Sequence, residues 1–193
     1  MAREQLTLTE LARVGFVELR EVRVRLHEVV ELGGPEPATL LPLLGKTASP
    51  DAALAALVSL LRQAPNETRA LLLHPDPTQR LLRVVGASSG LTEFFLRHPE
   101  ELTVLAKPLM TLPDLAGLTE DLLESVGTHD GFASLVDDEG WVALRVRYRR
   151  RLAQLAAFDL EQTDPVAGLD AVARTLADLA AAAVGAAPAV GPP

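Results

Sequence analysis

The side chains with the most catalytic potential in this 193-residue chain are its histidines, because it contains no cysteine. No two histidines lie four positions apart, the spacing that would place two metal ligands on one face of a helix. His74 and His98 each precede a proline at a predicted helix end, where an imidazole can meet unpaired backbone carbonyls. The pattern therefore indicates helix ends rather than a metal centre or a catalytic base. The four histidines are His27, His74, His98 and His129.

Motifs that would hold a phosphate or activate a serine are incomplete. Gly45-Lys46-Thr47 matches only the end of the G-x-x-x-x-G-K-[ST] loop, and the first glycine and a preceding strand are missing. Ser88 and Ser89 have neither an adjacent histidine nor a strand-turn-helix context, so they are predicted to cap a helix. We therefore expect no catalytic and no cofactor-binding residue in this chain.

The densest group of carboxylates is Asp137-Asp138-Glu139, with Asp130 close by. Such a cluster can hold Mg²⁺. Here it directly precedes a predicted long helix, whose N-terminal dipole is stabilised by negative charge. The group is therefore predicted to mark a helix start, and no metal ligand is expected.

Five arginines fall within two turns of the same predicted helix, in a chain whose net charge is −8. They could be a solvated face opposite Trp141 and Tyr148, paired with acids elsewhere. They could instead contact an acidic partner or another domain. The sequence leaves both interpretations open. The five residues are Arg145, Arg147, Arg149, Arg150 and Arg151.

The composition favours an all-α fold. Apolar residues make up 48% of the chain, aromatic residues only 4%, and isoleucine is absent. Alanine and leucine, both good helix formers, supply much of the apolar content. The acidic balance argues against nucleic-acid binding. The absence of cysteine, of an N-terminal apolar segment and of an apolar run of about 18 residues predicts a cytoplasmic protein without a membrane span.

Residues 1–106 are predicted to form a subdomain of short helices that pack orthogonally across tight glycine and proline corners. Thr7-Leu8-Thr9-Glu10 reads as a capping box. Ser49-Pro50-Asp51 contains a capping serine, a first-turn proline and an acid at the positive end of the helix dipole. Asp76-Pro77-Thr78-Gln79 reads as a second capping box, which opens a helix Pro77–Val85 closed by Gly86.

Residues 107–117 are predicted to be a linker, and residues 118–184 are predicted to contain a long antiparallel helical hairpin. The tail, residues 185–193, is rich in alanine, glycine and proline and is expected to be disordered. Apolar residues at helical spacing define the inward faces of the two long helices. They are Trp141, Leu144, Tyr148, Leu152 and Leu155 on the first helix, and Leu169, Val172, Leu176 and Leu179 on the second.

Several stretches together resemble one enzyme family. Arg80–Leu102, RLLRVVGASSGLTEFFLRHPEEL, is similar to a stretch near the N-terminus of the bifunctional glutamine synthetase adenylyltransferase/deadenylyltransferase family. Leu144–Leu160, LRVRYRRRLAQLAAFDL, resembles the arginine-rich helix of that family. Ser49–Leu61 and the Leu-Ala-Asp-Leu-Ala run at 176–180 also match in order and spacing. The resemblance covers most of residues 5–184.

The resemblance implies a role in nitrogen control. Enzymes of this family transfer AMP from ATP to a glutamine synthetase tyrosine and remove it by phosphorolysis, using ATP and Mg²⁺ under the control of a PII signal protein. Their first catalytic motif, a glycine-rich turn followed by S-D-x-D, does not occur in this chain. The chain is therefore expected to be an N-terminal helical scaffold, truncated before the C-terminal nucleotidyltransferase domain and inactive alone. The alternative is an independent helical interaction module that docks an acidic partner through the face Arg145–Arg151.

Overall fold

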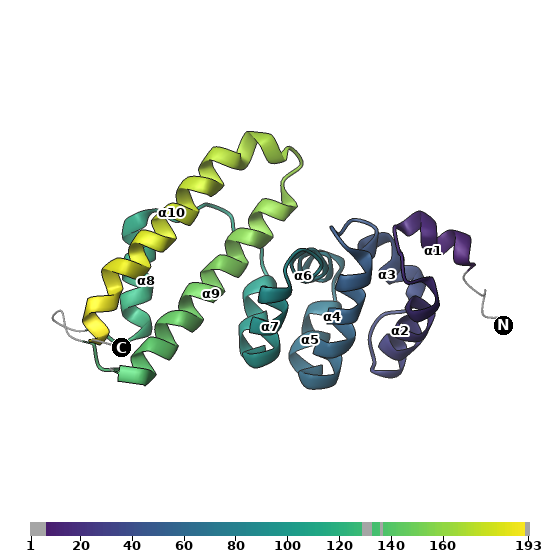
Figure 1. Ribbon diagram of the computed structural model, residues 1–193, viewed down its shortest axis with the longest axis horizontal. Coiled ribbons are helices and arrows are strands. Elements are labelled where there is room, and N and C mark those ends of the chain that lie inside the picture. Colours follow the sequence, from purple (N-terminus) through teal and green to yellow (C-terminus); the bar gives the residue numbers. More distant parts are fainter. Residues whose placement is uncertain (1–6, 129–132, 136, 192–193) are drawn as a thin grey trace. The chain divides into compact units, whose positions relative to one another are not determined.

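The computed structural model describes residues 7–128, 133–135 and 137–191 (Figure 1). Every regular element within those ranges is a helix, which confirms the all-α prediction. The chain divides into two compact units, Met1–Lys107 and Pro108–Pro193, called unit 1 and unit 2 below.

Unit 1 consists of short helices joined by tight corners. The central helix is α4, which packs against α2, α5, α6 and α7. Its side chains Leu54, Leu57 and Leu60 are fully buried, and Leu81 and Phe95 from neighbouring helices are fully buried as well. The elements are α1 (Leu8–Val14), α2 (Leu19–Glu31), α3 (Pro37–Leu44), α4 (Pro50–Gln63), α5 (Pro65–Leu72), α6 (Pro75–Ala87), α7 (Ser89–Arg97) and the 3₁₀ helix η1 (Pro99–Leu105).

Two of the predicted helix starts in unit 1 are confirmed by their hydrogen bonds. The Thr7 hydroxyl accepts from the Glu10 backbone N–H, and the Glu10 carboxylate accepts from the Thr7 N–H at 2.7 Å, which completes the capping box. At α4, the Ser49 hydroxyl accepts from the Ala52 N–H at 3.3 Å. These side chains satisfy backbone donors that have no partner inside the helix.

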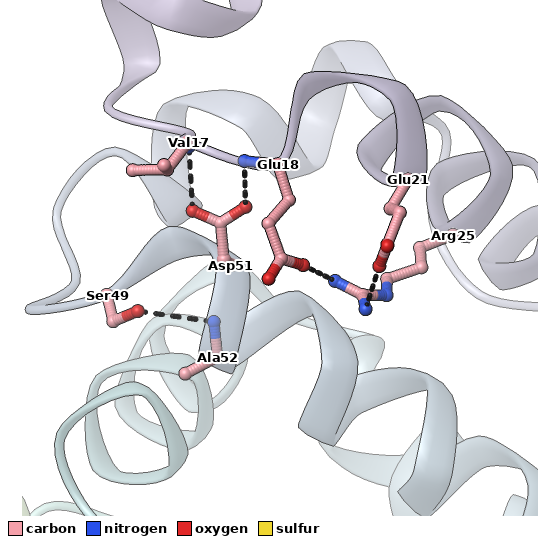
Figure 2. Close-up of polar contacts among 7 residues, drawn as sticks. All are labelled: Val17, Glu18, Glu21, Arg25, Ser49, Asp51 and Ala52. Carbon is pink, nitrogen blue, oxygen red and sulfur yellow. Dashed lines mark hydrogen bonds and ion pairs between the residues drawn. The ribbon is translucent and has the colours of Figure 1, made fainter.

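Asp51 has a role that its sequence context did not reveal. Its carboxylate accepts hydrogen bonds from the backbone N–H groups of Val17 at 2.9 Å and Glu18 at 3.1 Å (Figure 2). Glu18 is the N-cap of α2 and makes no side-chain capping bond of its own. Asp51 thus caps α2 from the first turn of α4, across more than 30 residues of sequence.

Replacing Asp51 by alanine is expected to lower the free energy of unfolding of unit 1 by about 1–2 kcal/mol, because two backbone donors at the start of α2 lose a charged acceptor. Asp76→Ala is the matched control, since Asp76 also lies in a helix first turn but is exposed. Amide hydrogen exchange in α2 measures the effect. Equal losses in the two variants would contradict the capping role.

The second predicted capping box, at Asp76-Pro77-Thr78-Gln79, is wrong. The helix begins two residues earlier, at Pro75. The Thr78 hydroxyl donates to the carbonyls of Leu71 and His74 rather than capping, and the Gln79 amide donates to the carbonyl of Leu43 at 3.0 Å. Either proline suits a first helical turn, so the local sequence did not distinguish the two starts.

Unit 2 contains α8 (Leu115–Ser125), α9 (Asp137–Glu161) and α10 (Pro165–Val190). Figure 1 shows α9 and α10 side by side, and α8 packs against both. Leu118 and Leu122 on α8, Leu144 and Leu155 on α9 and Leu179 on α10 form the core. The predicted inward face of α9 is confirmed, because its other members are partly buried against this core: Trp141, Tyr148 and Leu152.

Two boundaries in unit 2 differ from the predicted ones. The first helix starts at Leu115, inside the predicted linker 107–117, because the Asp114 carboxylate accepts from the Gly117 N–H and caps it. The last helix continues through Val190, where a disordered tail 185–193 was expected. Ala186 and Val190 are buried in the core of the unit, and this burial offsets the weak intrinsic order of the tail.

The predicted inward face of α10 is only half correct. Val172 and Leu179 are buried, but Leu169 is 59% exposed and Leu176 is 38% exposed. The buried face instead continues through Thr175, Ala182, Ala186 and Val190. Where helices lie close together, alanine can occupy a core position as readily as leucine. The positions of the large apolar residues therefore did not identify the buried face of α10.

Candidate functional site

The arginine-rich segment of α9 separates into two sets of side chains. Arg145 and Arg149 are exposed, whereas Arg147, Arg150 and Arg151 are half-buried. The Arg145 side chain donates to the backbone carbonyl of Trp141, one turn earlier, at 3.0 Å. The five arginines therefore do not form one continuous solvent-facing surface.

Two of these arginines converge on Asp121 of α8. Arg147 Nη1 lies 2.8 Å from Asp121 Oδ1, and Arg151 Nε lies 2.7 Å from Oδ2. A second nitrogen of Arg151 also contacts Asp121 Oδ1, so the Arg151 contact is bidentate. Arg151 Nη1 donates to Gln154 at 2.8 Å. This planar, two-bond geometry is the strongest form of an arginine–carboxylate contact.

Asp121 is only 8% exposed, while the side chains of Arg147 and Arg151 are 30% and 26% exposed. Burial raises the pKa of Asp121, but hydrogen bonding and charge attraction from Arg151 and Arg147 outweigh it and hold that pKa below its ordinary value. The Asp121 hydrogen bonds correspondingly raise the pKa of Arg151. We call Asp121, Arg147 and Arg151 the Asp121 cluster. All three side chains are ionised at neutral pH, and their contacts join α8 to α9.

The Asp121 cluster gives unit 2 a predictable response to acid. A carboxylate whose pKa is depressed by folding contributes stability above its unfolded pKa, and that contribution is lost as the pH falls through the folded value. We expect unit 2 of the wild-type chain to lose stability below about pH 4, measured by the fluorescence of Trp141, the only tryptophan. The stability difference from Asp121→Asn should shrink with falling pH; a constant difference would contradict the prediction.

Asp121 was missed at the sequence level, although a signal exists. It follows Leu118 by three residues and precedes Leu122, so helical spacing places it on the apolar side of α8. Charged residues are seldom buried without a partner. An acid on an apolar stripe, together with several arginines on another amphipathic helix, is the pattern that would have identified the pair.

The other candidate groups are dispersed. Asp137, Asp138 and Glu139 lie in the first turn of α9, as predicted. His98 is at the C-terminal end of α7, where its Nδ1 lies 3.5 Å from Glu100 and its ring lies beside Phe94. Within the described residues, no group of three potential ligands is close enough to hold a metal ion. The predictions for His129 and Asp130 fall outside the described residues.

An open hollow beside α8 has an acidic wall, formed in part by Glu120, Asp121 and Glu124. Lys46 and Thr47 follow the C-terminal end of α3, and the Thr47 hydroxyl donates to the carbonyl of Leu44 at 2.7 Å. The described helices include none with the length and apolarity needed to cross a membrane.

Proteins with similar sequences from several bacteria all carry the same name. A protein of Leifsonia xyli subsp. xyli, named a bifunctional glutamine synthetase adenylyltransferase/adenylyl-removing enzyme, is 55% identical over 190 residues, covering 98% of this chain. Proteins of the same name from Cutibacterium acnes and Streptomyces avermitilis are 31% and 34% identical over 93% and 96% of the chain. The chain belongs to this adenylyltransferase family. It spans only 18–19% of the length of these three relatives. No family model and no solved structure matches the chain.

The stretch Arg80–Leu102, which carries the resemblance to the adenylyltransferase family, has a structural explanation in unit 1. Arg80 is 3% exposed, and its Nη1 donates to the carbonyl of Leu105 at 2.7 Å, which links α6 to η1. Gly86 lies where α6 approaches α4 closely. The Ser88 hydroxyl caps α7 by accepting from the Leu91 N–H. Three residues of this stretch, Arg80, Gly86 and Ser88, therefore have roles in helix packing and helix capping.

Proposed function

We propose that this chain is a helical structural segment of a bifunctional glutamine synthetase adenylyltransferase/adenylyl-removing enzyme, and that it supplies no catalytic residue. The observation that carries the proposal is the similarity to the Leifsonia xyli relative, which covers 98% of this chain but 19% of that protein. The Asp121 cluster supports it, because two of the five arginines serve to join α8 to α9.

In this proposal the chemistry belongs to the longer polypeptide. The resemblance implies AMP transfer from ATP to a glutamine synthetase tyrosine and its phosphorolytic removal, with Mg²⁺ and with control by a PII signal protein. A nucleotidyltransferase domain elsewhere in that polypeptide would bind ATP and Mg²⁺, and glutamine synthetase would be its substrate. The helices of this chain would position that domain.

A chimaeric enzyme tests the proposal. In the Leifsonia xyli relative, the segment homologous to this chain is replaced by the chain itself, and AMP incorporation into glutamine synthetase is measured. We expect the chimaera to keep both transfer and removal of AMP, and the isolated 193-residue chain to show neither. A folded but inactive chimaera, or ATP-dependent adenylylation by the isolated chain, would overturn the proposal.

A second candidate function is an independent interaction module that docks an acidic partner. The observation that favours it is the exposure of Arg145 and Arg149, which lie one helical turn apart on α9. The docking face would then be this pair rather than all five arginines. The double variant Arg145→Glu/Arg149→Glu of the 193-residue chain distinguishes the two functions in a binding assay against an immobilised acidic protein. A docking module should bind before the charge reversal and not after it, whereas a scaffold should not bind in either form.

A further inference from the structure

The last helix of unit 2, α10, has an apolar surface that the core of the unit does not cover. Its large members are Val166, Leu169, Leu176 and Val184, which are 79%, 59%, 38% and 75% exposed. Exposed alanines lie between them along the same side of the helix, at positions 173, 177 and 180. We call these residues together the outer face. They form a continuous apolar strip, which in a folded protein marks a contact surface.

The charged residues of α10 leave most of its circumference apolar. They are Asp170, Arg174 and Asp178, which are four residues apart and therefore lie along one line. At 3.6 residues per turn, this charged line, the outer face and the buried face are each separated by about a third of a turn. The buried face consists of Val172, Thr175, Leu179, Ala182 and Ala186. A helix that is apolar on most sides is enclosed by other elements, so α10 has the pattern of a helix with a second neighbour.

The size of the outer face limits what can bind it. From Val166 to Val184 it is about 27 Å long and about 10 Å wide, which gives roughly 300 Å². Each partner in a stable complex of separate proteins buries about 800 Å². A contact between domains of one polypeptide holds with less, because the connecting chain keeps the local concentration of the partner high. The outer face therefore suits a contact within one polypeptide rather than a contact with a separate molecule.

The relatives of this chain are long enough to provide such a contact. The proteins from Leifsonia xyli, Cutibacterium acnes and Streptomyces avermitilis match 93–98% of this chain, but the match spans only 18–19% of their own length. The greater part of each relative therefore lies outside the match. A segment there could cover the outer face without a second molecule.

The residue types of the outer face indicate an apolar helix as its partner. The small alanines at 173, 177 and 180 allow another helix to approach closely, and the large side chains of that helix would fit over them. The outer face contains no charged side chain that would need an ionic partner. A lipid surface is a poor match, because helices that lie on membranes are rich in lysine and arginine along the polar side. The charged line of α10 instead has two acids and one arginine.

We propose that the outer face of α10 binds a helix with large apolar side chains in the remaining part of the same adenylyltransferase polypeptide. The proposal rests on the proposed function of this chain as a segment of a longer enzyme. It adds the surface through which the segment is joined to the rest. In the longer polypeptide, α10 would then be covered on two sides, and only the line Asp170, Arg174 and Asp178 would face water.

Photo-cross-linking in the chimaera with the Leifsonia xyli protein identifies the partner. The photoreactive amino acid p-benzoylphenylalanine replaces Leu169 on the outer face or, as the matched control, Ala171, which is exposed and lies on nearly the opposite side of α10. We expect the probe at position 169 to cross-link to a peptide outside the 193 residues, in a product with the mass of one polypeptide. The probe at position 171 should give no such product. A product that joins two polypeptides, as a second copy on the outer face would give, contradicts the proposal, and so does cross-linking confined to the 193 residues.

The double variant Leu169→Glu/Val184→Glu compares the outer face in the two settings. In the isolated 193-residue chain both side chains face water, so amide hydrogen exchange in α10 should stay the same. In the chimaera the two carboxylates would be buried, and exchange in α10 should become faster by at least about tenfold. Val142→Glu, at a 52% exposed valine of α9, is the control and should change exchange in α10 in neither protein. Equal effects of the double variant in both proteins would refute the cover.

The activity of the chimaera separates this inference from the proposed function. An active chimaera whose probe at position 169 finds no peptide outside the 193 residues counts against the covered outer face alone. A folded but inactive chimaera counts against the proposed function, whatever the probe finds. If the chimaera does not fold, the probe is placed at the position of the unaltered Leifsonia xyli protein that aligns with Leu169, where the same cross-link is expected and its absence contradicts the proposal.

Discussion

Replacing Asp121 by alanine is expected to lower the free energy of unfolding of unit 2 by about 2–3 kcal/mol. The change leaves two guanidinium groups between α8 and α9 without their carboxylate. Breaking a fully buried ion pair costs about 3–5 kcal/mol. The arginine side chains here are 26–30% exposed and can regain water, which places the expected loss below that range. Denaturant unfolding followed by Trp141 fluorescence reports on unit 2 directly.

The matched control is Glu120→Ala, because Glu120 is the exposed acidic neighbour of Asp121 on the same helix. It should change the unfolding free energy by no more than about 0.5 kcal/mol. A double-mutant cycle with Arg151→Ala should show a coupling energy of at least about 1 kcal/mol, since the two side chains share a bidentate contact. Additive effects would show that Asp121 acts through packing alone.

The features predictable from the sequence were those determined by local chemistry. Thr7 with Glu10, and Ser49 before Pro50, each carry the information for a helix start within four residues, and the structure confirms them. The inward face of α9 follows in the same way from the spacing of its large apolar residues. Such features need no knowledge of which other helix lies nearby.

The features that could not be predicted depend on a second segment of chain. Asp51 looks like a first-turn acid of α4, and only the fold brings it to the start of α2. The arginines of α9 look alike in sequence, and only the position of Asp121 separates Arg147 and Arg151 from Arg149. Leu169 is as apolar as Leu179, yet it is exposed, whereas Leu179, Ala182 and Ala186 are buried in the core of unit 2. In each case a partner from another helix decided the outcome.

Gly86→Val is expected to have a larger effect in unit 1 than Asp51→Ala. The sequence suggested that Gly86 closes a helix, but it lies inside α6, where α6 packs on α4. A Cβ atom at this position would lie 3.1 Å from the Cβ atoms of Ala53 and Thr47 and 3.2 Å from the Ser49 carbonyl oxygen. These distances are shorter than ordinary van der Waals contact, so α4 and the residues before it must shift by a few tenths of an ångström to admit a Cβ atom, and further for the branched side chain of valine.

We expect Gly86→Val to lower the free energy of unfolding of unit 1 by about 2–3 kcal/mol. The matched control is Gly185→Ala, at a helical glycine whose Cβ would meet nothing within 4 Å. That change should instead stabilise unit 2 by about 0.5–1 kcal/mol, because alanine restricts the unfolded chain and favours the helix. Hydrogen exchange in α4 and α6 reports unit 1, and Trp141 fluorescence reports unit 2. The two variants should change the free energy of unfolding in opposite directions. Helix propensity alone would not lower the stability of unit 1 when valine replaces Gly86, so a loss there indicates crowding between α4 and α6. A Gly86→Val chain as stable as the wild type would refute the close α4–α6 contact.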